Sequence, residues 1–413
     1  MVVSFVILAF FLVGFVFKPY YTMMLMAITY PTVSMFSINK IPIVLILLFL
    51  ALISVFIKYQ GKKQVIRSFP FYLSFFICIF SYIISYYFGQ TRGHINGIIA
   101  PLTQYALILV VWYYWPKDSG KYKRFFYKAS FIYLLIISVY GIYQALTGEN
   151  AFINYMYKTG QVELDIGEDM RYGVYRAQSL TLWFETYAAT CGMGLVFFVI
   201  SMVNKVIKTN VYYFALCLLL SISVLTAGSR SMLIMTAFML LSVLPKMFSN
   251  LKVIFGILIA FIAIYYFQED LIDQIIDSIV HQDKFNGSSS DMRLYQMYST
   301  LNFLSQSPVF GNGPGYISFA TSMSRDLQGG ESIIFSTLID RGIVGMITII
   351  FMYVQMVLYF YKRHRIDIVI MVLGFLVGKV LTMLPGMGDV YILMYAIPLC
   401  KFANTTNKQL EVK

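Results

Sequence analysis

The sequence contains little charge. Only 12% of its 413 residues are Asp, Glu, Lys or Arg, whereas 59% are hydrophobic, and the mean hydropathy is +0.74. About a quarter of the residues in an ordinary soluble domain are charged. This shortage excludes a soluble domain and predicts an all-α polytopic membrane protein.

Cysteine and histidine are also scarce. The four cysteines all lie inside apolar runs, so the sequence offers no disulfide framework. The three histidines are scattered without the spacing of metal ligands, which argues against a zinc site. We therefore expect no metal and no cofactor. The residues are Cys78, Cys191, Cys217, Cys400, His94, His281 and His364.

Apolar runs long enough to cross a bilayer recur along the whole chain. The first two are short and crowd around Lys18 and Pro19, so the runs predict about twelve transmembrane helices. The N-terminal run has no basic segment before it and no small-residue cleavage site after it, so we interpret it as a span and not as a signal peptide. The runs cover residues 3–17, 20–38, 41–57, 71–88, 97–115, 129–147, 178–203, 211–227, 231–247, 251–268, 343–361, 367–384 and 388–402.

The net charge of +12 is distributed unevenly. Lys and Arg gather in alternate loops, for example around residues 117–128 and 362–365, and the acids gather in the opposite loops. This pattern places the basic loops in the cytoplasm, where they contact anionic lipid headgroups, and argues against nucleic-acid binding. We predict a single integral membrane domain over residues 1–413, with larger outward loops at 148–177 and 269–342.

One outward stretch, Gly311–Gly345, combines turn residues with charge. The turn Gly313-Pro314-Gly315 comes first, then Glu331, and then a short apolar helix that we expect to end at Asp340-Arg341-Gly342. The turn is not a nucleotide-binding loop, because no Gly-Lys-Ser/Thr follows it, and we interpret it as a rigid turn that places the following loop. Charge is costly beside a bilayer, and a phosphate-bearing lipid substrate would explain why charged residues gather in this stretch.

Arg230 follows Gly228 and Ser229 at the outward end of a predicted span and opens a helix. Small residues let a ligand approach the backbone, a helix N-terminus favours anions, and a guanidinium matches phosphate oxygens. A snorkelling arginine at the membrane interface is the alternative. The positive-inside pattern disfavours arginine on this side, so we predict a phosphate-binding role.

Further ionisable residues lie on the same predicted face. Arg176 enters a span, with Arg171 nearby, and Glu185 lies inside that span. An ionisable group within a span predicts a functional site, although Glu185 can instead be the structural partner of an arginine. Arg293 either binds the substrate or pairs with an acid of its own loop.

Two residues of the second outward loop allow two interpretations each. Glu331 precedes an apolar helix, where a carboxylate either stabilises the helix N-terminus or acts as a general base. Tyr295 either stacks on a sugar or belongs to the aromatic belt at the membrane interface.

The order of these motifs resembles the O-antigen ligase/polymerase superfamily, whose signature region would span residues 220–360. The residues after Arg176 also resemble the approach to a middle helix in its members, and the first third of the chain matches by hydropathy alone. The resemblance is carried by Gly228-Ser229-Arg230, Arg293, Phe310-Gly311-Asn312-Gly313-Pro314-Gly315, an ionisable residue eleven positions before Gly342, and Gly342-Ile343-Val344-Gly345.

The resemblance implies a membrane glycosyltransferase of GT-C-like architecture, independent of metal, that uses an undecaprenyl pyrophosphate-linked oligosaccharide. Ligases of the superfamily carry histidine and asparagine where this chain has Glu331 and Ser332, which favours a Wzy-type polymerase of repeat units. We assign Arg230, Arg293 and Arg176 to the pyrophosphate and Glu331 to the acceptor hydroxyl, with inversion at the anomeric carbon. The other predicted substrate-binding residues are Glu185, Arg171, Tyr295, Gly313 and Gly315.

Two rival functions remain open at this point. An O-antigen ligase would transfer the glycan to lipid A core, and a flippase would move lipid-linked oligosaccharide across the membrane. A flippase should show two related halves, and we detect no half-repeat. The polymerase would lie in the bacterial inner membrane with its active site facing the periplasm. Its partners would be the lipid-linked donor and acceptor, the bilayer and a chain-length regulator protein.

Overall fold

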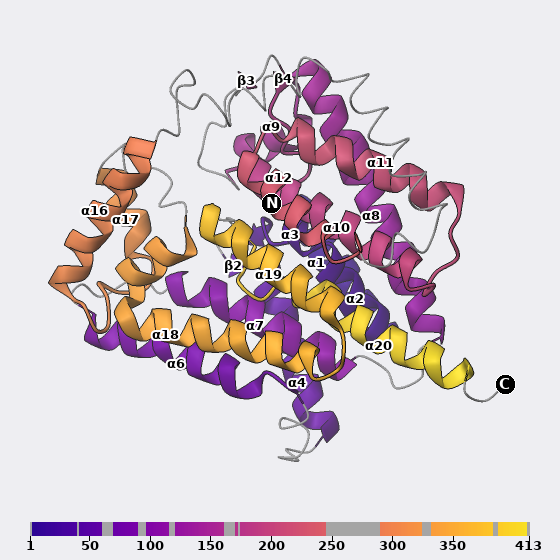
Figure 1. Ribbon diagram of the computed structural model, residues 1–413, viewed down its shortest axis with the longest axis horizontal. Coiled ribbons are helices and arrows are strands. Elements are labelled where there is room, and N and C mark those ends of the chain that lie inside the picture. Colours follow the sequence, from indigo (N-terminus) through magenta and orange to yellow (C-terminus); the bar gives the residue numbers. More distant parts are fainter. Residues whose placement is uncertain are drawn as a thin grey trace. The chain divides into compact units, whose positions relative to one another are not determined.

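The computed structural model describes ten segments of the chain, which form helices and two short hairpins (Figure 1). Residue contacts divide the chain into two compact units. Unit 1 comprises residues 1–61, 106–271 and 384–413, and unit 2 comprises residues 62–105 and 272–383. The described residues are 2–38, 41–59, 69–89, 96–114, 120–160, 170–171, 174–244, 290–323, 332–382 and 387–410.

Unit 1 contains most of the helices and both hairpins. In each hairpin the two strands are antiparallel, with Ser37 opposite Pro42 in one and Met170 opposite Tyr175 in the other. The elements are α1 (Val2–Phe17), α2 (Pro19–Ile28), α3 (Tyr30–Val33), β1 (Ser37–Ile38), β2 (Ile41–Pro42), α4 (Ile43–Tyr59), α8 (Gly120–Thr147), α9 (Ala151–Lys158), β3 (Met170–Arg171), β4 (Val174–Tyr175), α10 (Phe184–Val203), α11 (Val211–Thr226), α12 (Arg230–Leu240) and α20 (Leu393–Leu410).

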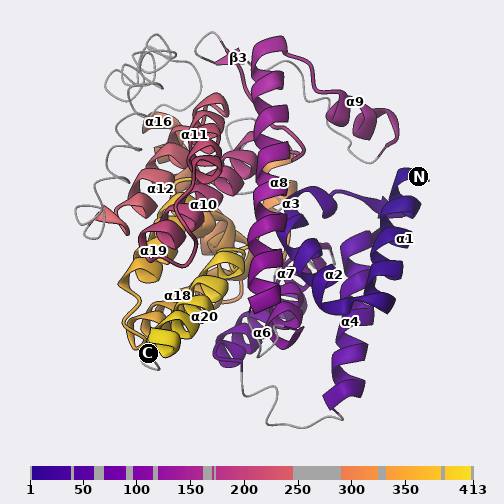
Figure 2. The same cartoon turned by 90° about the vertical axis from the view of Figure 1, so that its right-hand side faces the viewer.

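The centre of unit 1 is α10, which packs against α8, α11, α12 and α20 (Figure 2). Its best apolar window is 100% buried, as expected for a helix that is hydrophobic on every side. Two glycines allow the close packing. A Cβ atom at Gly192 would collide with Thr236 of α12, and one at Gly194 would meet Leu134 of α8 at 2.5 Å.

Ring contacts give the directions of these helices. Tyr127 of α8 stacks on Phe197 of α10, with ring centroids 5.0 Å apart, and Gly141 of α8 lies against Tyr187 of α10, so the two helices are antiparallel. Phe198 stacks on the Tyr213 ring of α11 at 5.4 Å. The end of α8, the start of α10, the end of α11 and the start of α12 therefore meet at one end of the bundle.

Unit 2 is built around a long pair of helices. Figure 1 shows α18 lying along α6, and the thiol of Cys78 on α6 donates to the carbonyl of Thr348 on α18 at 3.4 Å. Helix α7 (Asn96–Tyr114) has its first part in unit 2 and its last part in unit 1. The remaining elements are α6 (Tyr72–Phe88), α16 (Ser290–Gln306), α17 (Tyr316–Met323), α18 (Ile333–Tyr361) and α19 (Ile366–Leu381).

Hydropathy predicted several helices well and one badly. The runs 71–88 and 211–227 correspond to α6 and α11 to within a residue. The prediction of a continuous span over 20–38 is wrong, because α2 ends at Ile28 and α3 starts afresh with Pro31 in its first turn, where proline is tolerated. The run 251–268 lies outside the described residues.

The predicted end of a helix at Asp340–Gly342 is confirmed as a break inside α18, where two helical segments meet at Gly342. Helix α18 passes through Gly342, whose φ of 61° and ψ of −157° interrupt the helical geometry, and continues to Tyr361. The amides of Ile343 and Val344 donate to the carbonyls of Pro308 and Val309 at 3.0 and 3.1 Å, in place of intrahelical partners. A segment inserted into the helical hydrogen-bond ladder accounts for the kink.

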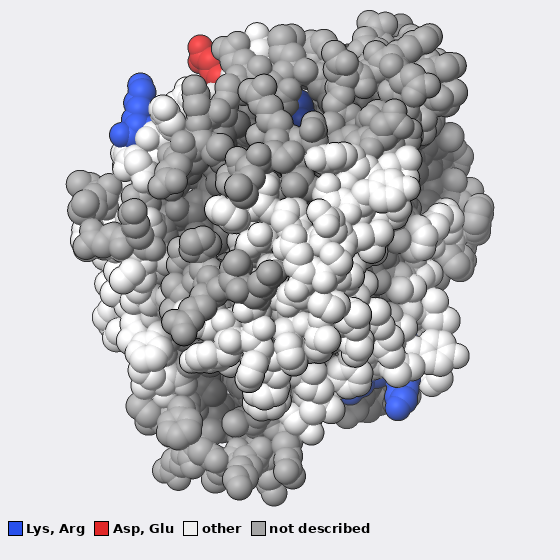
Figure 3. All heavy atoms as spheres, turned by 90° about the vertical axis from the view of Figure 1, so that its left-hand side faces the viewer, with Lys and Arg blue, Asp and Glu red and all other residues white. Residues whose placement is uncertain are grey.

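Within the described segments, three helices are long and apolar enough to cross a membrane, namely α8, α10 and α18, and several shorter apolar helices accompany them. The part of the chain that the structure describes is thus that of an all-α membrane protein. On the face drawn in Figure 3, most of the residues that are not grey are uncharged. The count of about twelve spans and the GT-C-like architecture stay predictions.

Candidate functional site

One end of the unit 1 bundle gathers several of the predicted site residues. We call it the arginine end and define it by residues 144–150, 176–185 and 227–230. It contains the C-terminal turn of α8, the N-termini of α10 and α12, and the turn between α11 and α12. A helix N-terminus carries about half a positive elementary charge. Two such termini at one end favour an anionic ligand.

A buried amide network holds this end together. The side-chain oxygen of Gln144 accepts hydrogen bonds from the amides of Gln178 and Ser179, at 2.9 and 2.8 Å, and from the Asn150 side chain at 2.9 Å. The Asn150 nitrogen also donates to the Ser179 carbonyl at 3.0 Å, and its oxygen caps α9 by accepting from the amide of Ile153. The segment that follows Arg176 is therefore fixed to the end of α8.

Arg176 lies against the turn between α11 and α12. The amide of Ala177 donates to the Thr226 carbonyl at 3.1 Å, and the Nε of Arg176 donates to the Ala227 carbonyl at 3.5 Å. The guanidinium carbon is 3.0 Å from the centre of the Phe184 ring, which adds a cation–π contact. Arg176 as a whole is half-buried.

Arg230 and Glu185 occupy the first turns of two neighbouring helices. Arg230 is the first residue of α12, after Gly228 with a φ of 62° and the extended N-cap residue Ser229. Glu185 is in the first turn of α10, and both charged residues are half-buried. Arg176 touches the residue before Glu185 and the turn that leads to Arg230. The structure thus brings these three predicted residues to the arginine end.

The other predicted charged residues are described incompletely. Arg171 is in β3 and Arg293 is near the start of α16, but their side chains lie outside the described part of the structure, as does the whole of Glu331. Tyr295 is on α16 and is 46% exposed. The roles predicted for these four residues stay predictions.

Gly313 and Gly315 lie in a turn that Asp340 of α18 holds. The amide of Gly313 donates to the Asp340 carbonyl at 3.0 Å, and the amide of Gly315 donates to its carboxylate at 2.8 Å. The other carboxylate oxygen accepts from the amide of Ile317 at 2.8 Å. These glycine amides already have acceptors within the protein, which agrees with a rigid turn. Their predicted contact with substrate stays a prediction.

Sequence reasoning gave no role to Asp340 or Arg341. The Arg341 side chain is 3% exposed, and its guanidinium donates to the hydroxyls of Ser81 at 3.2 Å and Thr337 at 3.4 Å. It also lies 3.9 Å from the centre of the Tyr82 ring. Two adjacent charges inside an apolar helix were the available signal, since such charges need partners.

Among the residues whose side chains are described, no three His, Cys, Asp or Glu residues group as metal ligands. The half-buried arginines and helix N-termini of the arginine end instead suit a phosphate, and the guanidinium of each can form two parallel hydrogen bonds to phosphate oxygens. Metal-independent chemistry stays a prediction.

The comparison with protein families bears on the second half of the chain. Residues 215–350 match the family model of the O-antigen ligase. The match includes Arg230, Arg293, the Gly313 turn and Glu331, and it confirms the resemblance to the O-antigen ligase/polymerase superfamily over that segment. It supports a role in assembling O-antigen or another surface polysaccharide. No curated protein matches the chain.

Proposed function

We propose that the protein is a Wzy-type polymerase that joins polyprenyl pyrophosphate-linked oligosaccharide repeat units at the outer face of the bacterial inner membrane. The observation that carries the proposal is the contact of Arg176 with the turn that opens α12 at Arg230. Two half-buried arginines at one end of a membrane bundle suit a pyrophosphate, which carries more than one negative charge.

The chemistry needs charge stabilisation more than it needs a nucleophilic side chain. The acceptor sugar hydroxyl attacks the anomeric carbon of the donor, and the bond from that carbon to the pyrophosphate oxygen breaks. Arg176, Arg230 and Arg293 would stabilise the negative charge that grows on the leaving pyrophosphate. Glu331 would accept the hydroxyl proton as general base, and Glu185 would orient an arginine or the acceptor. One displacement inverts the anomeric carbon.

The ligase is the second candidate, because the family model that matches carries that description. The two enzymes share the donor and differ in the acceptor, which is a second lipid-linked repeat unit for the polymerase and lipid A core for the ligase. Glu331 and Ser332 stand where ligases carry histidine and asparagine, and this difference supports the polymerase.

The test supplies purified protein with lipid-linked repeat units and EDTA, either alone or with lipid A core, and sizes the products on a gel. We expect a ladder of polymers without added lipid A core. Arg230→Ala and Glu331→Ala should each slow the reaction by at least about a hundred-fold, as loss of a transition-state contact does. Arg363→Ala is the matched control, because Arg363 is an exposed arginine on the turn after α18.

Each alternative gives a different result. A single transfer to lipid A core, without a ladder, would indicate the ligase. Intact substrate in both reactions, with lipid-linked units accumulating inside cells that lack the protein, would indicate the flippase. A ladder that Arg230→Ala and Glu331→Ala leave unchanged would keep the polymerase and remove these two residues from its active site.

A further inference from the structure

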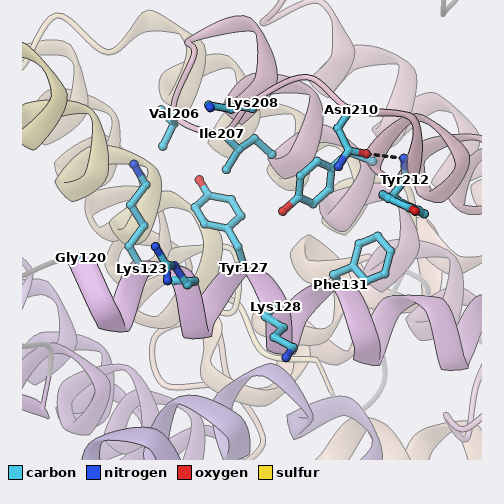
Figure 4. Close-up of a pocket in the computed structure, with 12 residues that line it drawn as sticks. Gly120, Lys123, Tyr127, Lys128, Phe131, Val206, Ile207, Lys208, Asn210 and Tyr212 are labelled. Atoms are coloured by element: carbon cyan, nitrogen blue, oxygen red, sulfur yellow. Dashed lines mark hydrogen bonds between the residues drawn. The ribbon is translucent and has the colours of Figure 1, made fainter.

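The end of the unit 1 bundle opposite the arginine end contains a pocket of about 740 Å³, drawn in Figure 4. Its walls come from the first turns of α8 and from the loop and helix start that follow α10. It is lined by Gly120, Lys123, Arg124, Tyr127, Lys128, Phe131, Val206, Ile207, Lys208, Asn210, Tyr212 and Tyr213. The volume is in the range of small-ligand sites.

The lining is strongly basic. Lys123, Arg124 and Lys128 lie within two turns of α8, Lys208 lies on the facing loop, and none of the twelve lining residues is an acid. Like charges one helical turn apart repel each other, so an anion in the pocket would relieve an unfavourable arrangement. Figure 4 shows Lys123 and Tyr127 extending from α8 toward the loop, whereas Lys128 points away from it.

The pocket is held in shape by contacts beneath the cations. Tyr127 is buried, and its hydroxyl hydrogen-bonds with that of Ser201 at 2.7 Å. The Ser201 carbonyl accepts from the amides of Val206 and Ile207 at 2.8 and 3.3 Å, which fixes the loop against α10. The Phe131 and Tyr213 rings, 5.8 Å apart, add an apolar wall. Basic groups beside an apolar wall suit an amphiphile.

The length of α8 places the pocket at the depth of lipid headgroups. This helix has 28 residues and is therefore about 42 Å long, whereas the hydrocarbon core of a bilayer is about 30 Å thick. The apolar run that crosses the bilayer starts at residue 129. Residues 120–128 therefore extend past the hydrocarbon, with their cations beside the positive end of the helix dipole.

We propose that this pocket binds the phosphate group of an anionic phospholipid, with Lys123, Arg124 and Lys208 around the phosphate and the aromatic wall beside the glycerol and upper acyl chains. The same cations could take free inorganic phosphate, so the shared chemistry is a phosphate. The pocket is separate from the proposed polymerase site, because the 20 residues of α10 put about 30 Å between the two ends of the bundle.

The test counts lipids bound to the purified full-length protein by native mass spectrometry. Phosphatidylglycerol, phosphatidylcholine and inorganic phosphate are titrated separately, and phosphate is also added in competition with phosphatidylglycerol. The variant K123Q/R124Q/K208Q should bind phosphatidylglycerol at least about ten-fold more weakly, since each surface cation contributes several-fold in affinity. The control K121Q/K362Q/R363Q removes the same charge at exposed residues outside the pocket and should bind normally.

The outcomes separate the two sources of phosphate. Preference for phosphatidylglycerol over phosphatidylcholine that the pocket variant loses establishes the lipid, and binding of inorganic phosphate without a lipid preference establishes free phosphate. Equal affinity of the pocket variant and the control overturns the site. If the triple variant does not fold, Lys208→Gln on the loop should still weaken binding several-fold, and Lys208→Arg should restore it. No loss in Lys208→Gln would also overturn the proposal.

Discussion

Arg176 in unit 1 and Arg341 in unit 2 both lie against a glycine-containing turn, and they differ in how far each residue is buried. Arg341 is 3% exposed and is bound by Ser81 and Thr337, so it joins α18 to α6. Arg176 is half-buried against the α11–α12 turn. A fully buried arginine supports the fold, whereas a half-buried one keeps some surface at which a ligand can bind.

The two turns differ in whether their backbone amides have acceptors within the protein. In unit 2 the amides of Asn312, Gly313, Gly315 and Ile317 all donate to the backbone or carboxylate of residues 339–340. In unit 1 the α11–α12 turn ends at a helix N-terminus, where backbone amides lack intrahelical partners. Changes in unit 2 should therefore affect folding first, and changes at the arginine end should affect activity first.

The largest effect is expected for Gly342→Ala. The φ of 61° and ψ of −157° at this residue suit glycine alone, and an added Cβ would lie 2.6 Å from the Gly311 nitrogen and the Val309 oxygen. We expect the free energy of unfolding to fall by about 3 kcal/mol or more. Thermal unfolding in detergent and the yield of monodisperse protein measure it.

Gly160→Ala is the comparison for a glycine that has a positive φ but no neighbour to collide with. Gly160 also has a positive φ, of 65°, but nothing lies within 4 Å of its would-be Cβ. It should cost only about 1 kcal/mol. Equal losses in the two variants would mean that the close approach of residues 309–311 to α18 does not stabilise unit 2.

Asp340→Asn should come next. The replacement keeps the shape of the side chain but puts an NH2 group in place of one of the two accepting oxygens. This NH2 group then faces the backbone N–H of Gly315 or Ile317, which has no acceptor there. We call the contact between the turn at residues 311–317 and Asp340 of α18 the joint. In the variant one donor of the joint loses its acceptor, at a cost of about 2 kcal/mol. The unfolding midpoint should fall, whereas Glu149→Gln, the same change at an exposed acid, should leave it unaltered. An unaltered midpoint in Asp340→Asn would show that the joint is not held by its carboxylate.

Hydropathy predicted the helices, and the order of the motifs predicted that Arg176 and Arg230 lie on the same face. Neither predicted the joint. The helices follow from local composition, so α6 and α11 were found almost to the residue. Asp340 binds amides that lie 23 and 25 residues earlier, and no local pattern encodes such a contact. Gln144 was missed for the same reason, since one glutamine in an apolar helix does not show that it binds residues 34 and 35 positions away.

Gln144→Leu tests whether the arginine end is held as firmly as the joint. Leucine would leave the amides of Gln178 and Ser179 without their acceptor, which we expect to cost about 1 kcal/mol each. Hydrogen exchange should quicken in residues 176–181 and stay unchanged in residues 311–317. Residues 311–317 lie in unit 2, so their exchange is the internal control. Unchanged exchange in the leucine variant would mean that other contacts position Arg176.

The variants Arg176→Lys and Arg341→Lys should have the smallest effect on stability. Together they test the comparison of the two arginines most directly. Lysine keeps the charge but loses the planar fork and much of the stacking on Phe184 or Tyr82. At the buried Arg341 the change should cost about 1 kcal/mol, because one hydroxyl partner is lost, and at Arg176 about 0.5 kcal/mol.

Polymer formation should change in the opposite order. Arg176→Lys should slow it about ten-fold or more if the guanidinium binds pyrophosphate through two parallel hydrogen bonds, and Arg341→Lys should slow it only in proportion to the folded protein that remains. If both variants lose activity only as they lose folded protein, Arg176 supports the fold as Arg341 does, and the pyrophosphate must be bound by other residues.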